Sequence, residues 1–311
     1  MDMQENYIVS ASPHIRSKDT TQSIMLNVIL ALMPALVASV ILFGFRALLV
    51  EAVSVASAVL CEAAWCAVRK EKQSIRDLSA IITGLLLAFN LPASIPLYIP
   101  VIGAIVAIIV VKELFGGIGY NFANPAIVAR ITLAVSFPSL MTSYTYPRLF
   151  QACDALTSAT PLAAGKAGLP LMDLLLGTHG GVIGETCAVA LLAGLIWLLV
   201  THTIEITIPA VYVGTVFVLS WIFGYNPLQQ VLSGGLLLGA IFMATDYVTS
   251  PYTHLGKIIF AAGCGVITCM IRFFGNMREG VSYSILLMNL LVPIINEKTR
   301  RVPLGGGAAK K

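Results

Sequence analysis

Two short stretches, residues 82–87 (ITGLLL) and residues 233–238 (SGGLLL), share one pattern in the two halves of the chain. In each, small residues precede three leucines, and a polar turn with proline and a further apolar segment follow. A repeat of this spacing places five apolar segments in each half. Because five is odd, the second half must insert upside down relative to the first, as in inverted-repeat transport proteins. The two stretches therefore predict an all-α integral membrane protein built as a five-plus-five inverted repeat.

The composition points to the same class of protein. Of the 311 residues, 58% are hydrophobic and only 11% are charged, whereas a soluble domain carries about 25% charged residues. No soluble domain of useful size remains once the apolar runs are removed. The net charge of +4 is not evidence for nucleic acid, so the expected partner surface is the lipid bilayer.

Ten apolar segments are predicted to cross the membrane, and several are shorter than the roughly 20 residues that a perpendicular helix needs. The segments are 23–43, 47–68, 78–92, 95–111, 125–141, 184–201, 205–223, 228–245, 256–274 and 281–296. Short spans interrupted by Gly or Pro are typical of half-helices that line a site instead of facing lipid. The alternative is nine spans, if 78–111 enters and leaves the membrane on one side.

The distribution of basic residues predicts the orientation. Thirteen of the 19 Lys and Arg residues fall on the side of the N-terminus, five fall on the other side, and Arg130 falls within a span. The positive-inside rule then places both termini in the cytoplasm. The expected organisation is a cytoplasmic tail (1–22), a first membrane half (23–141), an extracytoplasmic loop (142–183), a second membrane half (184–296) and a cytoplasmic tail (297–311).

The extracytoplasmic loop contains residues 154–162 (DALTSATPL), in the longest polar interval of the chain. Ser, Thr and Asp side chains compete for backbone hydrogen bonds, and Pro161 pushes Thr160 out of the helical region. A threonine held extended on an exposed loop is reachable by a modifying enzyme. The alternative is an ordinary turn or helix cap.

A second polar interval, residues 112–126 (KELFGGIGYNFANPA), lies between the fourth and fifth segments. Gly116 and Gly117 permit a tight turn and close approach of a planar ligand. Asn121 and Asn124 can pair with a ring carbonyl or ring N–H, because an amide both donates and accepts hydrogen bonds. The alternative is a tight turn between helices in which asparagine caps the next helix.

Three charged residues are further candidates. Arg130 lies within a span, where a charge is costly and is usually paired, although a side chain near the helix end could also reach the interface. Glu185 follows glycines at the start of the sixth segment, where it could hold a ligand or satisfy the helix dipole. Asp246, at the end of the eighth segment, could be a cation or proton station or could cap the ninth segment.

The stretch 154–160 (DALTSAT) resembles the flavinylation motif of the family of the Rnf D and Nqr B subunits, although that family usually has Gly at Ala155 and Ser158. The resemblance implies that FMN is bound to Thr160 through a phosphoester bond. It also implies four determinants read by a flavin transferase, which are Asp154, Thr157, Ser158 and Ala159.

Four other stretches resemble signatures of the same family: 115–126, 180–186, 243–251 and 278–293. In the family the first of these lies near a second flavin, riboflavin, that is not covalently bound. The resemblance thus implies a riboflavin site at Gly116, Gly117, Asn121 and Asn124. It also implies a fold with a five-plus-five inverted repeat.

By this resemblance the chain is a multi-pass protein of the cytoplasmic membrane that acts with the A, B, C, E and G subunits of an Rnf complex. The complex moves electrons between ferredoxin and NAD and couples them to Na⁺ or H⁺ transport. The six cysteines form no CxxC pair, so no iron–sulfur or zinc site is expected in this chain. No complete active site is expected in the chain alone. The alternative function is a channel or permease without a cofactor.

Overall fold

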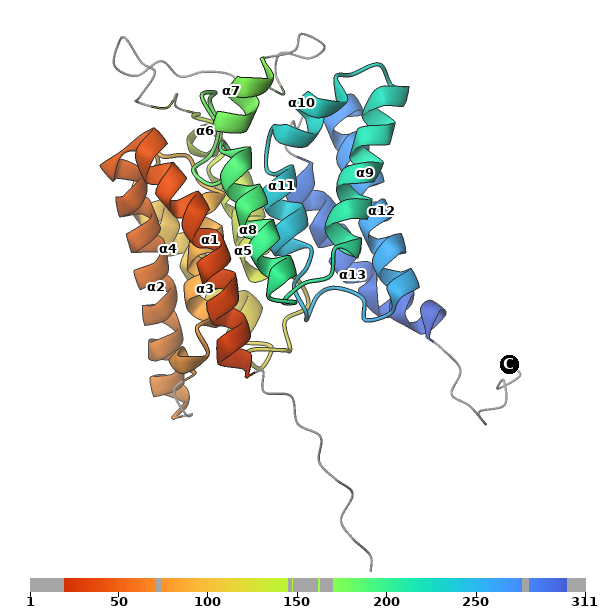
Figure 1. The fold of residues 1–311 in the computed structure, drawn as a ribbon. Helices are drawn as coiled ribbons and strands as arrows, with labels where there is room; N and C mark the ends of the chain where they lie inside the picture. Colours follow the sequence, from red (N-terminus) through yellow and green to blue (C-terminus); the bar gives the residue numbers. More distant parts are fainter. Residues whose placement is uncertain are drawn as a thin grey trace, which may run out of the picture.

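The computed structural model describes residues 20–70, 74–144, 147, 162, 170–275 and 280–300. These residues form helices joined by loops, without a β-strand (Figure 1). The first half contains α1 (Thr21–Phe43), α2 (Phe45–Arg69), η1 (Ile75–Asp77), α3 (Ser79–Phe89), α4 (Tyr98–Ile105), η2 (Val106–Glu113), α5 (Pro125–Ser136) and α6 (Pro138–Met141). The second half contains α7 (Leu171–Leu176), α8 (Ala188–Val200), α9 (Thr207–Ile222), α10 (Pro227–Leu232), α11 (Leu236–Leu238), η5 (Gly239–Met243), α12 (His254–Phe274) and α13 (Val281–Thr299).

Three of these helices, α1, α2 and α12, are long and apolar enough to cross a membrane by length and composition. Four more apolar helices, α3, α5, α8 and α9, are shorter than a perpendicular span requires. The all-helical fold and the mixture of long and short apolar helices agree with the sequence analysis. The count of ten spans and the inverted repeat stay predictions.

Local sequence explains several helix starts. α1 begins with a capping box in which Thr20 Oγ1 accepts from Ser23 N and Ser23 Oγ accepts from Thr20 N, each at 3.1 Å. α5 begins as predicted, with Asn124 as its cap and Pro125 in its first turn. α1 and α2 meet at Gly44, whose φ of 75° is available to glycine at little cost.

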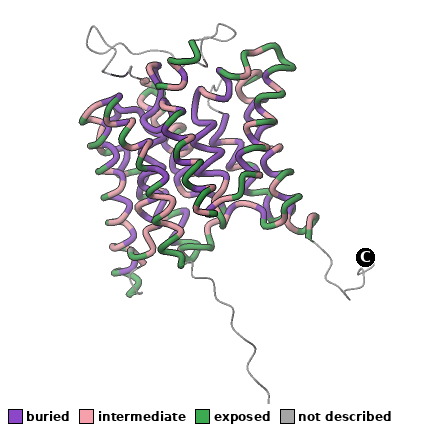
Figure 2. The backbone as a smooth tube through the Cα atoms, viewed as in Figure 1, coloured by how far each residue is buried: buried purple, intermediate pink, exposed green. Residues whose placement is uncertain are grey.

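α3, α11 and η5 form the centre of the bundle. Nearly every residue of these short elements is buried, and the buried backbone runs along the middle of the molecule (Figure 2). A helix that is apolar on all sides must be enclosed by other helices. Both repeated stretches of the sequence therefore lie in the core.

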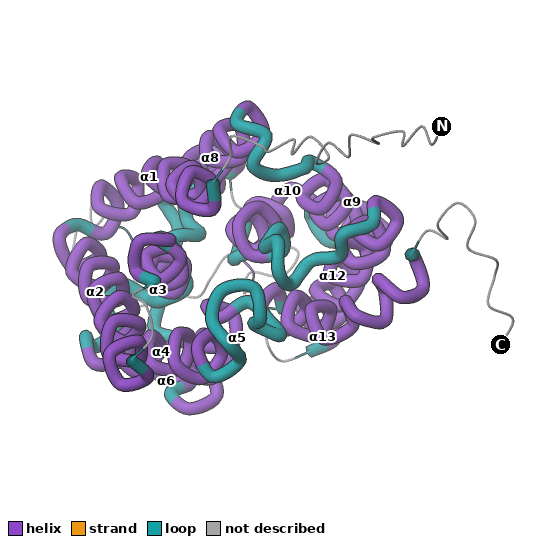
Figure 3. The backbone as a smooth tube through the Cα atoms, turned by 90° about the horizontal axis from the view of Figure 1, so that it is seen from below, coloured by secondary structure: helices purple, strands orange, loops and turns teal. Residues whose placement is uncertain are grey.

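Viewed along the bundle, α1 to α4 lie on one side and α9, α10, α12 and α13 lie on the other (Figure 3). α1 packs against α8, and α5 packs against α13. These are the first and fifth of the predicted spans in each half. α1 begins and α13 ends at one end of the bundle, which we name the inner end after the predicted topology, while α7 and α10 lie at the other, which we name the outer end (Figure 1).

Three predicted spans differ from the observed helices. The predicted sixth span starts at 184, but α8 begins at Ala188, because the glycine-rich segment before it forms turns. The predicted eighth span, 228–245, is broken into α10, α11 and the π-helix η5. The predicted fifth span, 125–141, ends as α5 at Ser136, since Pro138 starts the separate turn of α6.

Candidate functional site

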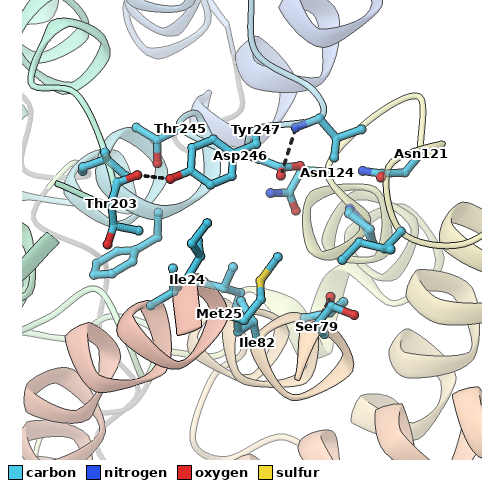
Figure 4. A pocket seen from close by; sticks show the side chains of 18 of the residues that line it. Ile24, Met25, Ser79, Ile82, Asn121, Asn124, Thr203, Thr245, Asp246 and Tyr247 are labelled. Carbon is cyan, nitrogen blue, oxygen red and sulfur yellow. Dashed lines mark hydrogen bonds between the residues drawn. The ribbon is translucent and has the colours of Figure 1, made fainter. Parts of the chain in front are cut away.

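A cavity of about 340 Å³ lies at the inner end of the bundle. Ile24 and Met25 of α1 and Ile82 of α3 form one wall, opposite Asn121, Asn124 and Asp246 (Figure 4). This combination of apolar walls and a few polar groups is typical of a small-molecule site.

The polar side of the cavity joins two stretches that are far apart in sequence. Asn124 Oδ1 accepts from Ala126 N at 3.1 Å, and its Nδ2 donates to Met243 O at 3.3 Å. Asp246 accepts hydrogen bonds from Thr249 Oγ1 at 3.1 Å and from Val248 N at 3.4 Å, and Asn121 Nδ2 donates to Ala123 O at 3.1 Å. Asn124 therefore acts as a helix cap and also lines the cavity, while Asn121 and Asp246 present an amide and a carboxyl group to it.

Gly116 and Gly117, predicted to contact a ligand, do not line this cavity. They have φ values of 116° and 84°, and Gly117 N donates to Lys112 O at 3.0 Å. Their positive φ is what the turn after η2 requires. Their role in the structure is to form the turn that positions Asn121.

A buried ion pair borders the cavity. Lys112 Nζ lies 2.8 Å from Glu62 Oε2 and donates to Ser79 Oγ at 2.7 Å. Lys112 and Glu62 are 3% and 0% exposed, so each charge depends on its partner. Glu113 Oε1 lies 3.6 Å from the same ammonium group.

A second buried polar cluster lies where α11 begins, and it contains Arg130 and Glu185. Arg130 Nη1 donates to Asn90 Oδ1 at 2.7 Å and to Ser282 Oγ at 3.1 Å. Arg130 is therefore paired inside the bundle and does not reach the membrane surface. Glu185 is 3% exposed and has Arg130 and Arg272 as charged neighbours.

Gly235 lies next to two charged groups of this cluster. A Cβ atom on Gly235 would lie 3.3 Å from Glu185 Oε2 and 3.4 Å from Arg130 Nη1. Arg272 Nη1 donates to Gln230 O at 2.5 Å on the other side. Within the described part of the chain, Glu185 Oε2 and Arg272 Nε have no hydrogen-bond partner.

The proposed modification motif itself lies outside the described residues, including Asp154, Thr157, Ser158, Ala159 and Thr160. Leu162, two residues after Thr160, is described. A Cβ atom on Gly234 would lie 2.8 Å from Leu162 Cδ1 and 3.1 Å from Arg272 Nη2. The chain just beyond the motif therefore packs beside the cluster of Arg130, Glu185 and Arg272.

Sequence reasoning missed Lys112, Glu62 and Arg272 as parts of buried clusters. The acidic residue at 62 inside an apolar span was a usable signal, since such a residue is usually paired. Arg272 was one of the five basic residues counted on the side away from the N-terminus, because it lies near the end of the predicted segment 256–274. Among the described residues, no group of three or more His, Cys, Asp or Glu could hold a metal ion.

Comparison with known proteins assigns the chain to a family. The family model described as NQR2, RnfD, RnfE matches residues 8–305. The chain is 47% identical to the D subunit of the Na⁺-translocating ferredoxin:NAD⁺ oxidoreductase complex of Acetobacterium woodii, with 98% of each chain covered. It is 41% identical to the D subunit of the proton-translocating ferredoxin:NAD⁺ oxidoreductase complex of Clostridium ljungdahlii, with 96% of each covered.

A third relative, the D subunit of the ion-translocating oxidoreductase complex of Stutzerimonas stutzeri, is 36% identical over 94% of this chain and 95% of its own. The family model and all three relatives extend over nearly the whole chain. The chain is a membrane protein that belongs to the NQR2, RnfD, RnfE family.

Proposed function

We propose that the chain is the flavin-carrying D subunit of a multisubunit ion-translocating ferredoxin:NAD⁺ oxidoreductase in the cytoplasmic membrane. The observation that carries this proposal is the near-complete match to D subunits of such complexes, together with the motif at 154–160. The two most similar relatives named above are described for different ions, so the coupled ion is Na⁺ or H⁺. The NAD and iron–sulfur sites belong to the partner proteins of the complex, which include the A, B, C, E and G subunits.

We propose that FMN is attached to Thr160 through a phosphoester bond, made by a flavin transferase that reads Asp154, Thr157, Ser158 and Ala159. The neighbouring cluster suits a phosphate group. Arg130 and Arg272 provide two positive charges against one negative charge from Glu185, and Arg272 Nε is an unpartnered buried donor in the described structure. A guanidinium group is well matched to phosphate oxygens.

We propose that the inner cavity binds a second, non-covalent flavin, riboflavin in chemical class. The volume of about 340 Å³ lies within the range of small-molecule sites. The walls formed by Ile24, Met25 and Ile82 suit an apolar ring, while Asn121 and Asp246 can accept and donate hydrogen bonds at its polar edge. The flavins supply the redox chemistry, and the protein supplies their positions and electrostatic surroundings.

In this arrangement the chain's own residues hold two separate sites at opposite ends of the bundle. The Asn121 and Asp246 side chains orient the inner ring, and Lys112 sets the charge near it. The buried core of α3 and η5 excludes water between the two sites.

The deciding experiment is fluorescence after denaturing electrophoresis of the chain expressed with a flavin transferase. The wild-type chain should give a flavin band under ultraviolet light, and Thr160→Ala should abolish it while the chain still inserts. Thr178→Ala is the matched control, because this outer threonine donates to Asp173 Oδ1 at 2.8 Å and should keep the band. A fluorescent Thr160→Ala chain would show that another residue carries the flavin. A dark wild-type chain would favour a permease without a cofactor.

A further inference from the structure

α2 carries two buried glutamates with different surroundings. Glu51 is 2% exposed and Glu62 is 0% exposed. They are eleven residues apart, about three helical turns, so they lie on one face of the helix. Glu62 pairs with Lys112 at 2.8 Å and also accepts a hydrogen bond from Ser74, so it is held as a carboxylate.

Glu51 has no such cation in the described structure. The helices that pack against its part of α2 are α1, α3 and α4, and they contain no Asp, Glu, Lys, Arg or His. Arg46, on the same helix, points its Nη2 to Ile95 O at 2.9 Å. The other charged groups packed against α2 lie towards its inner end, on η1 and η2: Arg76, Asp77, Lys112 and Glu113.

The contacts of Glu51 are made with α1. Glu51 Oε1 lies 2.6 Å from Ser39 Oγ, and Ser39 Oγ lies 2.7 Å from Leu36 O. Glu51 Oε2 is buried and has no partner in the described structure. The Ser39 hydroxyl has a single proton, and a carbonyl oxygen has none, so one more proton is needed for two full hydrogen bonds. A proton on Glu51 Oε1 completes the chain from Glu51 to Ser39 to Leu36.

Energetic considerations favour the same arrangement. Burying an ionised carboxylate without a cation costs free energy. The carboxyl group is more stable there when it is protonated or when a bound cation balances its charge. The carboxyl oxygens, the Ser39 hydroxyl and the Leu36 carbonyl are all oxygen donors, the type that hard cations prefer. At Glu62, by contrast, the Lys112 ammonium already fills the place of a cation.

We propose that Glu51, Ser39 Oγ and Leu36 O form an exchangeable monovalent-cation site that holds either H⁺ or Na⁺. Glu51 lies six residues into α2 from Phe45, about 9 Å along the helix, and therefore in the outer part of the bundle. The site extends the proposed ion translocation to named residues. It does not depend on flavin attachment, so each proposal can fail while the other stands.

Labelling with dicyclohexylcarbodiimide in membranes that contain the complex tests this site. The carboxyl O–H adds across one C=N bond of the reagent, with the oxygen bonding to carbon and the proton moving to nitrogen. Peptide mass spectrometry then reads the added mass at each glutamate. Glu51 should be labelled and Glu62 should not, because only a protonated carboxyl group reacts in this way.

Two arms of the experiment distinguish the cation. If Na⁺ is bound, Na⁺ should protect Glu51 while K⁺ at equal ionic strength does not. If only H⁺ is bound, labelling should fall as the pH rises and Na⁺ should have no effect. Labelling that is absent at every pH, or that responds to neither Na⁺ nor pH, would overturn the proposal.

Substitutions refine the test. Glu51→Gln keeps a donor for Ser39 and should remove the label at this peptide while the flavin band persists. Ser39→Ala should shift the Na⁺ concentration for half-protection, or the proton concentration for half-labelling, by roughly tenfold. Ser57→Ala is the matched control, because Ser57 Oγ donates within its own helix to Val53 O at 2.7 Å and should shift neither. If Ser39→Ala leaves the concentration for half-protection or half-labelling unchanged, Ser39 is not a ligand of the site.

Discussion

The start of α3 lies just before the first repeated stretch and the start of α11 lies within the second, and the surroundings of these two helix starts differ. At the start of α3, Lys112 lies between Glu62 and Glu113 and next to Ser79, beside an open cavity. At the start of α11, two arginines lie near one glutamate, with Arg130 and Glu185 buried and Arg272 half-buried. Two similar apolar sequences thus lie beside regions of opposite charge. The region at the start of α3 has an excess of negative charge, and the region at the start of α11 has an excess of positive charge. The pattern of leucines sets where the helices lie, while distant residues set the chemistry at each end.

The largest expected difference between these regions concerns stability. Lys112→Met leaves Glu62 buried without its cation and should cost about 3–5 kcal/mol of folding free energy. The midpoint of thermal unfolding in detergent measures this loss. Adding Glu62→Gln to Lys112→Met should recover much of it.

Lys257→Met is the matched control for that measurement. Lys257 pairs with Glu205 at 2.8 Å, but the Glu205 side chain is 61% exposed, so the loss should stay below about 1 kcal/mol. Equal losses in the two lysine variants would show that the Lys112 pair is no more important than a surface pair.

Arg130→Met should cost less than Lys112→Met, about 1–3 kcal/mol, because Glu185 retains Arg272 as a charged neighbour. The loss arises mainly from Asn90 Oδ1 and Ser282 Oγ, which lose the hydrogen bonds from the guanidinium group. Unfolding midpoints of the two variants, measured side by side, test the ranking. If Arg130→Met loses more folding free energy than Lys112→Met, then Arg272 does not compensate for the loss of the Arg130 charge next to Glu185.

The inner cavity should lose its ligand without any effect at the outer end. The double change Asn121→Ala and Asn124→Ala should weaken non-covalent flavin binding roughly ten- to hundredfold. Flavin extracted from the purified complex measures the inner site, and the fluorescent band measures attachment at Thr160. Asn226→Ala removes a helix cap at the outer end and controls for loss of capping alone. If the flavin extracted from the double variant is still stoichiometric with the protein, these asparagines do not bind the flavin and act only in capping and turns.

The smallest expected effect compares two glycines at equivalent positions of the repeat. A Cβ atom on Gly84 would lie 2.8 Å from Val55 Cα, which is backbone and cannot easily move. A Cβ atom on Gly235 would meet only the ends of the Glu185 and Arg130 side chains, at 3.3 and 3.4 Å. Gly84→Ala should therefore cost about 1–3 kcal/mol and Gly235→Ala less than about 1 kcal/mol. The reverse order of unfolding midpoints would mean that Gly235, and not Gly84, is the close contact.

Several parts of the site could be predicted because their signals are local. The fifth segment was predicted to begin at residue 125, with an asparagine cap as one interpretation of the preceding turn, and the structure confirms that start and the cap by Asn124. Asn121 and Asp246 were separate candidates, and the structure places them at one cavity. Gly116 and Gly117 do not line this cavity, and their contact with a ligand stays a prediction, because a glycine pair that permits a tight turn looks the same in sequence as one that approaches a ligand.

The amino-acid sequence by itself determined the class of fold, the apolar segments and the motif at 154–160, since composition and short-range patterns carry that information. Only the tertiary structure decided which charges meet. Lys112 and Glu62 are fifty positions apart, and Arg130 and Ser282 lie in different halves. The physical reason is that burial makes each charge depend on a partner, whereas an apolar helix of either half offers no local sign of which partner it will meet. The packing of α1 on α2 likewise decided that Glu51 faces a serine hydroxyl and no cation among the described residues.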